Sequence, residues 1–307
     1  MGRWVCEGNG LKFAEKDYPA VFLAADRASA GAQKKYVRLS RGTLVLLVFG
    51  AGFAAASPVV ACMKPALAGI SAMLLAASLL CTLYLKVQKP EQLWYGGRAV
   101  AESAKSMAWR YMTGAAPYLV GVPVVDVERE FISALESIFK ERKQLAFGFG
   151  GEFSEQPQIS DRMRAVRAAT LAERKQAYLA GRISDQRAWY GNQAKGNRLA
   201  EGRYFNVVFA SQLAALVAAV ALVRWPSSNV RLTGFFASLA SALIAWLQLK
   251  QHKELAQSYS VAELELGFIE EKARYVLTEQ EFSDFVSDAE NAISREHTLW
   301  VARRDRI

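Results

Sequence analysis

Five residues between positions 94 and 109 have the types and the spacing to form an interacting polar surface. Trp94, Arg98, Glu102, Lys105 and Trp109 follow one another at intervals of 4, 4, 3 and 4 residues. Side chains at these intervals share one face of an α-helix. The carboxylate of Glu102 is then within reach of both cations, and a tryptophan closes the series at each end. We call these five residues the polar ladder.

Three interpretations of the polar ladder are open. A solvated stripe of ion pairs would contribute a few tenths of a kcal/mol per pair. Two tryptophans on the same face argue against full solvation and favour a contact with another helix or another subunit. A small-ligand site is the third interpretation. We predict a cytoplasmic helix for assembly or gating, made by the ladder together with Arg110.

Catalytic chemistry has little support in this sequence. Hydrolysis needs a nucleophile, a base and an orienting group, and the chain has 2 histidines and 3 cysteines. The glycine-containing stretch 191–197 is no phosphate-binding Walker loop, because Lys-Ser/Thr does not follow its last glycine. We predict no enzyme activity, no cofactor, and no catalytic or metal-binding residue.

Four charge-free apolar stretches dominate the composition, which is 52% hydrophobic and only 22% charged. They cover residues 43–63, 66–85, 204–223 and 232–249. About 20 helical residues span a hydrocarbon core, and soluble core helices are rarely apolar on every side. The sequence therefore predicts an all-α integral membrane protein with four transmembrane helices in two hairpins. The first stretch begins too far along the chain for a cleaved signal peptide, so we expect permanent spans.

Basic residues near the span ends set the predicted orientation. They precede span one and follow span two, and the pattern recurs more weakly around the second hairpin: Lys34, Lys35, Arg38, Arg41, Lys86, Lys89, Lys195, Arg198, Arg203, Lys250 and Lys253. We expect a multi-pass protein of the inner membrane with both termini and long helices in the cytoplasm. This pattern explains much of the formal charge of +9, so no nucleic-acid partner is expected.

The two hairpins resemble each other in sequence. Lys35 and Arg38 recur at an offset of 160, and Tyr95 and Tyr111 recur at an offset of 164 as Tyr259 and Tyr275. An even number of spans per copy makes this a parallel repeat. We predict a first two-span unit at 1–147, a linker at 148–160 and a second two-span unit at 161–307.

Further helices are expected outside the spans. One covers 91–113, and another begins at a capping Asp126 and runs to about residue 146. A helix starting at residue 160 or 161 leads to span three, with breaks near Gly181 and Gly191. The last, over 279–295, is amphipathic, with Phe282, Phe285, Ala289 and Ile293 at helical spacing.

Small polar residues in the spans are candidates for lining a pore or for packing helices together. They are Ser71, Ser78, Thr82, Ser211, Gln212, Ser238, Ser241 and Gln248. Such residues let helices approach closely and hydrogen-bond across their interface, and that interpretation is the better supported. One chain has too few spans to enclose much water, so a pore requires a homo-oligomer in the lipid bilayer.

The segment after the first hairpin resembles the SLATT family, the SMODS- and SLOG-associating two-transmembrane effector domains. The family pattern stands here as Trp94, Arg98, Ala101, Glu102, Lys105, Trp109, Arg110, Tyr111, Met112, Gly114 and Pro117. The resemblance is best over 20–145, and the order of elements is similar over 160–305, although the second copy lacks the Trp/Arg/Glu/Lys series.

This resemblance implies a tandem of two such domains. The function it implies is an oligomeric pore-forming effector of bacterial conflict or antiviral defence, triggered by a nucleotide-type signal, with a nucleotide sensor or cyclase as a candidate partner. The alternative is a non-conducting membrane scaffold that recruits a cytoplasmic partner.

Overall fold

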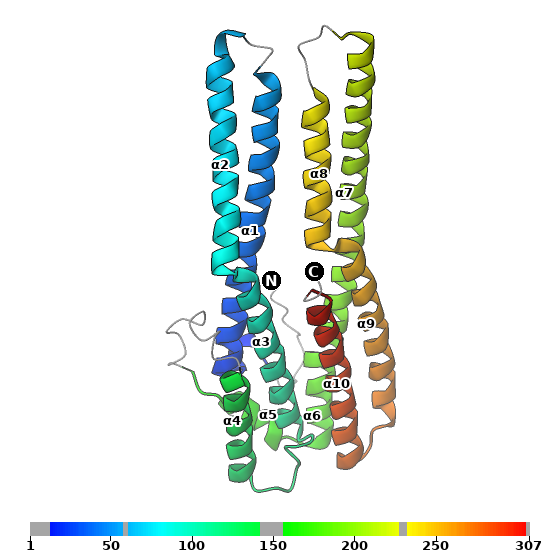
Figure 1. Cartoon of the computed structure of the whole chain (residues 1–307). Coiled ribbons are helices and arrows are strands. Elements are labelled where there is room, and N and C mark those ends of the chain that lie inside the picture. Colours follow the sequence, from blue (N-terminus) through cyan, green and yellow to red (C-terminus); the bar gives the residue numbers. More distant parts are fainter. Residues whose placement is uncertain (1–12, 58–60, 142–155, 227–231, 305–307) are drawn as a thin grey trace. The chain divides into compact units, whose positions relative to one another are not determined.

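The protein is helical throughout the part of the chain that the structure describes. This computed structural model covers residues 13–57, 61–141, 156–226 and 232–304, and no β-strand occurs within them (Figure 1). The helices are α1 (Ala20–Ala56), α2 (Lys64–Gln88), α3 (Pro90–Thr113), α4 (Val124–Glu141), α5 (Asp161–Ala168), α6 (Leu171–Tyr178), α7 (Asp185–Arg224), α8 (Leu232–Lys250), α9 (His252–Lys272) and α10 (Glu279–Arg304). Short 3₁₀ turns lie at Glu15–Asp17, Ala61–Met63 and Ala273–Tyr275, and a π-helical segment at Leu179–Ser184 precedes α7.

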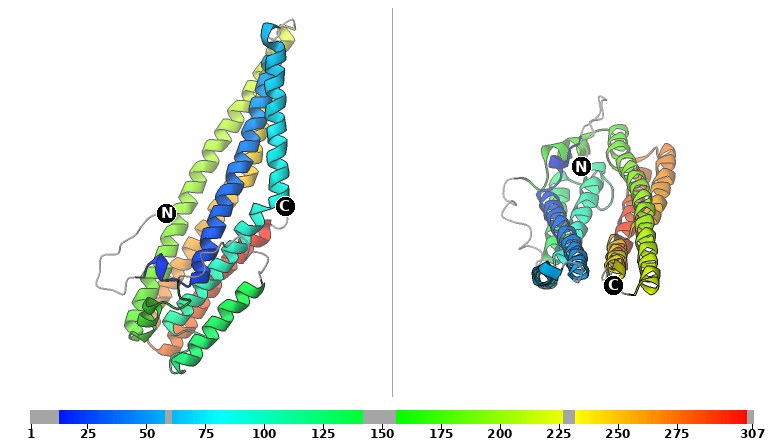
Figure 2. Two further views of the ribbon diagram at one scale, coloured as in Figure 1. Left: turned by 90° about the vertical axis from the view of Figure 1, so that its left-hand side faces the viewer. Right: turned by 90° about the horizontal axis from the view of Figure 1, so that it is seen from above.

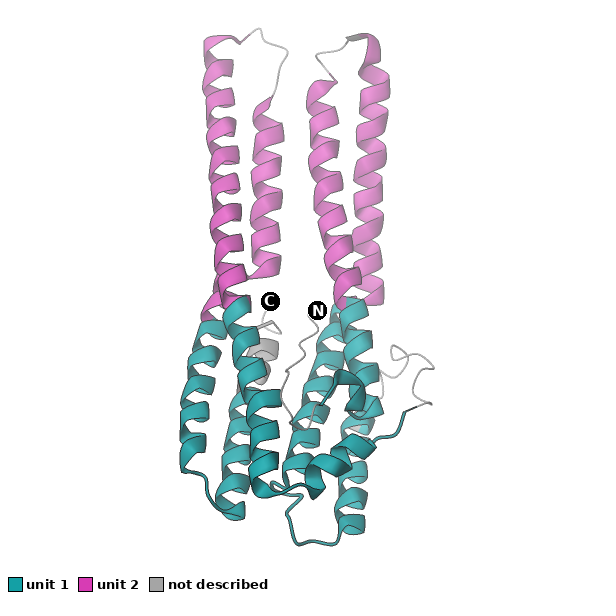
Figure 3. Ribbon diagram, turned by 180° about the vertical axis from the view of Figure 1, so that it is seen from behind, with its two compact units in different colours: residues 1–32, 91–192, 258–307 teal, residues 33–90, 193–257 magenta. Residues whose placement is uncertain are grey.

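The chain forms two compact units, each assembled from separate stretches of the sequence (Figure 3). Unit 1 comprises residues 1–32, 91–192 and 258–307, and unit 2 comprises residues 33–90 and 193–257. Each unit therefore takes residues from both halves of the sequence. The long helices α1 and α7 contribute to both units.

Unit 2 contains the predicted hairpins. Helices α1 and α2 run side by side, as do α7 and α8 (Figures 1 and 2). Four helical stretches are long and apolar enough to cross a membrane: Ala20–Ala56, Lys64–Gln88, Leu171–Arg224 and Leu232–Tyr275. The prediction of an all-α membrane protein with four spanning helices is confirmed.

Burial in unit 2 is inverted relative to a water-soluble protein. Large apolar side chains such as Phe49, Leu80 and Phe209 are exposed, whereas Ser71 and Ser78 are buried. Ser71 Oγ donates a hydrogen bond to the Gly50 carbonyl across the α1–α2 interface at 2.8 Å. A Cβ on Gly50 would lie 3.0 Å from the Leu75 side chain, so the two helices approach as closely as a glycine allows. This pattern is typical of helices that pack in lipid, where small residues replace the apolar core.

The core of unit 1 is formed by aromatic and apolar residues from most of its helices. Its largest fully buried apolar side chains are Trp109, Tyr111, Tyr118, Tyr178, Phe131, Phe282, Met112 and Met163. Phe282, Phe285, Ala289 and Ile293 of α10 are all buried, which confirms the predicted apolar face of that helix.

Several predicted boundaries are wrong in detail. The first spanning helix ends at Ala56, before the predicted limit at 63, because the chain turns at Ser57 ahead of Pro58. Asp126 lies inside α4, which starts at Val124 just after Pro123, and its carboxylate pairs with Arg129 instead of capping the helix.

The predicted helix breaks have mixed outcomes. The predicted break near Gly181 corresponds to the π-helical segment, whereas α7 passes through Gly191 without a break. Helix α5 begins at Asp161, one of the two predicted starts, and Ser160 caps it by accepting a hydrogen bond from the Met163 amide. Helix α10 continues to Arg304, beyond the predicted end at 295. Most of the predicted linker at 148–160 lies outside the described residues.

Replacement of Ser71 by Leu tests the packing of the first hairpin. Overfilling a tight contact costs about 1–3 kcal/mol, so we expect Ser71→Leu to lower the melting temperature of the detergent-solubilised protein. Ser241→Leu on the exposed side of α8 is the matched control and should leave the melting temperature unchanged. Equal melting temperatures for wild type and Ser71→Leu would contradict this packing.

Candidate functional site

The centre of the polar ladder is an ion pair on α3. Arg98 Nη2 lies 2.6 Å from Glu102 Oε1, and its Nη1 lies 3.8 Å from Asp26 Oδ1 of α1. The Arg98 side chain is 31% exposed, so water screens part of the attraction. The pair predicted from the spacing is therefore formed within unit 1, where it also joins α3 to α1.

The two tryptophans of the ladder are core residues. The Trp94 carbonyl accepts a hydrogen bond from Ser29 Oγ at 2.9 Å. The Trp109 indole N–H donates to the Tyr18 hydroxyl at 2.8 Å, and its ring contacts Tyr178 with 5.6 Å between centroids. The Trp94 ring stacks on Tyr95 with 4.7 Å between centroids, so both tryptophan side chains are buried and make contacts within the chain.

Lys105 faces an aromatic ring and a second cation. Its Nζ lies 5.7 Å from the centroid of the Tyr18 ring. Burial lowers the pKa of Lys105, and the positive charge of Arg182 lowers it further, while Glu102 acts in the opposite direction. The charge of Arg182, in another segment of the chain, therefore acts on the inner end of the ladder.

That segment contributes a buried ion pair that the sequence analysis did not predict. Arg182 Nη2 lies 2.8 Å from Glu290 Oε2 of α10, and Arg182 Nε donates to Oε1 at 3.0 Å. The Tyr178 hydroxyl donates to the same carboxylate at 2.9 Å. The side chains of Arg182 and Glu290 are 1% and 0% exposed. Burial raises the pKa of Tyr178, with the charge of Glu290 as the second cause, so its hydroxyl remains a hydrogen-bond donor.

The π-helical segment positions Arg182. A π-helix inserts one residue into the helical turn and is frequent at functional sites. Next to Arg182, a Cβ on Gly181 would lie 3.0 Å from the Trp109 ring, so the segment approaches α3 where a side chain would not fit. Arg182 Nη1 is buried without a hydrogen-bond partner, which leaves part of this charge uncompensated.

A weak signal for this pair existed in the sequence. Glu290 is a single acidic residue on the otherwise apolar face that Phe282, Val286, Ala289 and Ile293 form on α10. A lone charge on a buried face requires a partner. The sequence could not identify that partner, because Arg182 is 108 residues away.

Arginines also hold the ends of the helices of unit 1. Arg110 Nη2 donates to Asn291 Oδ1 of α10 at 2.9 Å. Arg167 of α5 donates to the carbonyls of Tyr111 and Tyr118 at 2.7 and 2.8 Å. These carbonyls lie at or beyond the C-terminal end of α3, where backbone acceptors lack helical donors. Arg110 therefore joins α3 to α10 within the chain, and its predicted part in assembly or gating stays a prediction.

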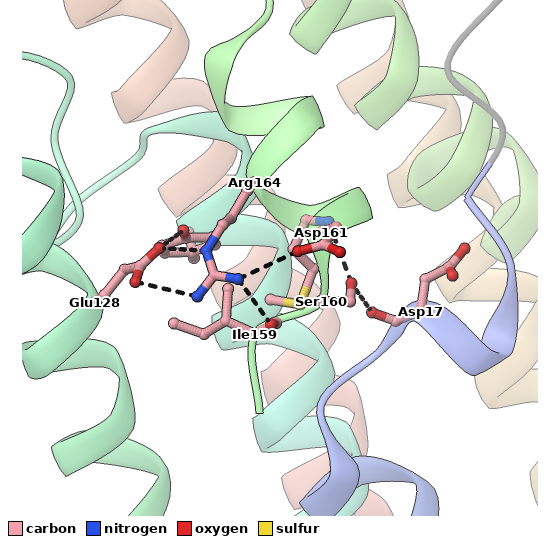
Figure 4. Close-up of polar contacts among 8 residues, drawn as sticks. Asp17, Glu128, Ile159, Ser160, Asp161 and Arg164 are labelled. Carbon is pink, nitrogen blue, oxygen red and sulfur yellow. Dashed lines mark hydrogen bonds and ion pairs between the residues drawn. The ribbon is translucent and has the colours of Figure 1, made fainter. Parts of the chain in front are cut away.

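A cluster of polar contacts nearer the surface joins α4 to α5 (Figure 4). Arg164 Nε and Nη2 bind the two oxygens of Glu128 at 2.8 and 3.2 Å. Ser160 Oγ donates to the Asp17 carbonyl at 2.7 Å. The hydrogen bonds from Arg164 are the main cause that lowers the pKa of Glu128, so this carboxylate stays ionised at neutral pH.

The arrangement in unit 1 binds helices to one another. The ladder and the Arg182–Glu290 pair connect α1, α3, the π-helical segment and α10 around a few charges. Among the described residues, no group of three or more His, Cys, Asp or Glu side chains could hold a metal ion.

The eight polar residues of the spans fall into two groups. Ser71, Ser78 and Ser211 are buried, and Ser78 Oγ donates to the Thr43 carbonyl at 3.4 Å. The others lie on exposed or half-buried surface: Thr82, Gln212, Ser238, Ser241 and Gln248. Ser71 and Ser78 therefore pack the first hairpin, and the second group faces the surroundings of the chain.

Comparison with protein families gives two matches that follow one another along the chain. Residues 19–175 match the model described as SMODS and SLOG-associating 2TM effector domain 3. Residues 178–300 match SMODS and SLOG-associating 2TM effector domain 1. No curated protein and no solved structure gives a significant match to the chain.

The buried ion pair yields a stability prediction. Removal of one partner leaves an unpaired buried charge, which costs about 3–5 kcal/mol. We expect Glu290→Leu to lower the free energy of unfolding of unit 1 by this amount, measured by denaturant titration in detergent. The double variant Arg182→Met/Glu290→Leu should recover most of the loss, because no charge is then left buried. A double variant less stable than Glu290→Leu would contradict this account.

Proposed function

Because this chain belongs to the SMODS- and SLOG-associating two-transmembrane effector family, as a tandem of two such domains, we propose that it is a pore-forming membrane effector that acts as a homo-oligomer. Domains of this family are membrane effector domains associated with conflict systems. A pore would allow such an effector to damage the cell by dissipating ion gradients, without any catalytic residue.

Gln212 carries this proposal. Its side chain is exposed on α7 within the charge-free stretch 204–223, among exposed apolar residues such as Phe209 and Leu213. An amide that faces lipid has no hydrogen-bond partner, and burial of an unpaired polar group costs free energy. In an oligomer the amide would face either water in a pore or a neighbouring copy, and both remove that cost.

The proposed location is the inner membrane, with both termini in the cytoplasm. Lys34, Lys35, Arg38 and Arg41 precede the first span, whereas the loop between spans one and two carries only Lys64. This asymmetry supports the orientation under the positive-inside rule. Because each hairpin crosses the membrane twice, the residues of unit 1 would all lie on one side.

The trigger we propose is a nucleotide-type signal, received by unit 1 directly or through a sensor protein. Such a signal can open a pore only if it binds the open assembly more tightly than the closed one. Arg98 joins α3 to α1, Arg110 joins α3 to α10, and Arg182 holds Glu290 of α10. These contacts support a role for unit 1 in transmission, because α1 leads into span one and α3 follows span two.

A non-conducting scaffold is the second candidate function. The observation that favours it is the absence of any charged residue from the four apolar stretches, so that no charged ring forms a selectivity filter. A scaffold would bind a stoichiometric cytoplasmic partner and would never conduct ions.

Leakage from vesicles tests the proposed pore. We expect the purified full-length protein to release a fluorescent dye from phosphatidylethanolamine/phosphatidylglycerol vesicles when the activating member of a panel of cyclic nucleotides is added. Gln212→Leu should lower the leak rate by about an order of magnitude, since apolar constrictions exclude water. Val217→Leu, an exposed apolar position of the same helix, is the control. Intact vesicles in every condition, together with a captured partner in fixed stoichiometry, would favour the scaffold.

Glu102 provides a test of the polar ladder. Its partner Arg98 is partly exposed, so Glu102→Ala should cost at most about 1 kcal/mol of stability and leave membrane insertion intact. We expect weaker assembly or a weaker response to the signal, measured by oligomer size and dye release. Glu136→Ala removes a similar pair with Lys140 on the surface of α4 and serves as the control. Unchanged oligomer size and dye release in Glu102→Ala would refute the proposed role.

A further inference from the structure

Helix α9 presents an apolar stripe to the outside of unit 1. Leu264, Phe268 and Tyr275 are 65%, 69% and 80% exposed, and Val261 is exposed beside them. The intervals of 3 and 4 residues place Val261, Leu264 and Phe268 on one face of α9, and Tyr275 lies in the 3₁₀ turn that follows the helix. We call these four residues the α9 stripe. The stripe comes after Lys250 and Lys253 in the sequence, and these two lysines mark the end of the fourth apolar stretch. Contact with lipid chains therefore does not explain why the stripe is exposed and apolar.

The internal repeat shows what this face does in the other copy. At the offset of 164, Leu264, Phe268 and Tyr275 correspond to Val100, Ala104 and Tyr111 of α3. Those three α3 residues are completely or almost completely buried. The same helical face is therefore a packing surface in the first repeat and an open surface in the second.

The opposite faces of the two helices correspond as well. Glu102 and Trp109 of the ladder correspond to Leu266 of α9 and Ala273 of the 3₁₀ turn that follows it. Leu266 and Ala273 are buried in the core, as Trp109 is. Helices α3 and α9 thus turn equivalent faces towards the core of unit 1, and they differ in burial on the opposite face.

Helices α4 and α5 cover Tyr111 near the C-terminal end of α3. Tyr111 contacts the Phe131 ring of α4 with 5.0 Å between centroids and donates a hydrogen bond to Glu128 at 3.1 Å. Arg167 of α5 lies 5.1 Å above the Tyr111 ring. In the first repeat, helices of the same chain thus cover this tyrosine.

The helix at the corresponding place after α9 packs on other surfaces. Phe282 and Phe285 of α10 contact the Tyr178 ring with 6.4 and 6.2 Å between centroids. Asn291 and Glu290 of α10 bind Arg110 and Arg182. With α10 held by these contacts, the α9 stripe remains open.

We propose that the α9 stripe is a subunit interface, covered by a second copy of this chain. The inference rests on the proposed homo-oligomer and identifies the surface through which it assembles. The first repeat shows that this helical face is built to accept another helix. Glu265 and Glu271 lie exposed beside the stripe and disfavour a membrane of anionic lipid as the occupant. Arg274 pairs with Glu271 within the chain at 3.2 Å, so Lys272 and Glu265 are the exposed charges of opposite sign that a contact between identical chains can pair.

Phe268→Glu in the full-length protein tests the interface. Burial of an ionised carboxylate in an apolar contact is unfavourable, so we expect the dissociation constant of the oligomer to rise by about tenfold or more. The measurement is mass photometry of the protein in nanodiscs or detergent over a range of concentrations. Val125→Glu makes a similar change at an equally exposed position of α4 and should leave the oligomer intact.

A labelling experiment covers the case in which Phe268→Glu does not fold. In the variant Phe268→Cys, we expect a maleimide to react with residue 268 at least about tenfold more slowly in the oligomer than after dissociation. Mass spectrometry of the peptide that contains residue 268 separates this signal from Cys62 and Cys81, which are free thiols.

The possible outcomes separate this inference from the proposed pore. A monomeric wild-type protein, an oligomer unchanged by Phe268→Glu, equal labelling rates, or an equal loss of assembly in Val125→Glu would each overturn the interface. Vesicle leakage by wild type with an unaffected Phe268→Glu oligomer would leave the pore standing without this surface. A wild-type oligomer that depends on Phe268 and never leaks would retain the interface and remove the pore.

Discussion

The hydrocarbon core of a membrane imposes the constraint on which the rest of this structure depends. Backbone N–H and C=O groups find no water there, so a chain that crosses must satisfy them within helices or closed barrels. The four apolar stretches meet this constraint as helices, and their large side chains are exposed while Ser71 and Ser78 are buried. The packing of unit 2 follows from the same cause, since between helices in lipid small residues and hydrogen bonds to carbonyls replace an apolar core.

Unit 1 is packed differently from unit 2, because it buries charged groups among aromatic side chains. A buried ion pair such as Arg182–Glu290 contributes little net stability, since desolvation offsets most of the attraction. It does restrict how α10 can dock, because a shifted helix would leave Glu290 unpaired in the core. Tyr178, Tyr18 and Trp109 extend the polar contacts towards the ladder on α3. A unit built in this way favours one arrangement of its helices. A signal-dependent effector would also require a second arrangement.

Helices α3 and α9, which correspond in the two repeats, differ in the residues of their inner faces and in the burial of their outer faces. On the inner face the first repeat has Arg98 and Glu102, where the second has Ala262 and Leu266. On the outer face the first repeat is covered by its own helices, whereas the second exposes aromatic and aliphatic side chains. Duplication therefore allows one copy to hold polar contacts and the other to offer an apolar surface, which a pair of identical domains could not do.

The sequence alone determined the membrane-spanning class, the helical character, the repeat and the Arg98–Glu102 pair, because hydropathy and helical spacing are local properties. It also placed the apolar face of α10. Only the tertiary structure decided that Trp94 and Trp109 are core residues, that Arg182 pairs with Glu290, and that each compact unit draws on both halves of the chain. These features join residues about a hundred positions apart, and no local pattern specifies which distant charge or ring will be the partner. The packing of the helices makes that choice, since it alone brings such residues within a few ångströms of one another.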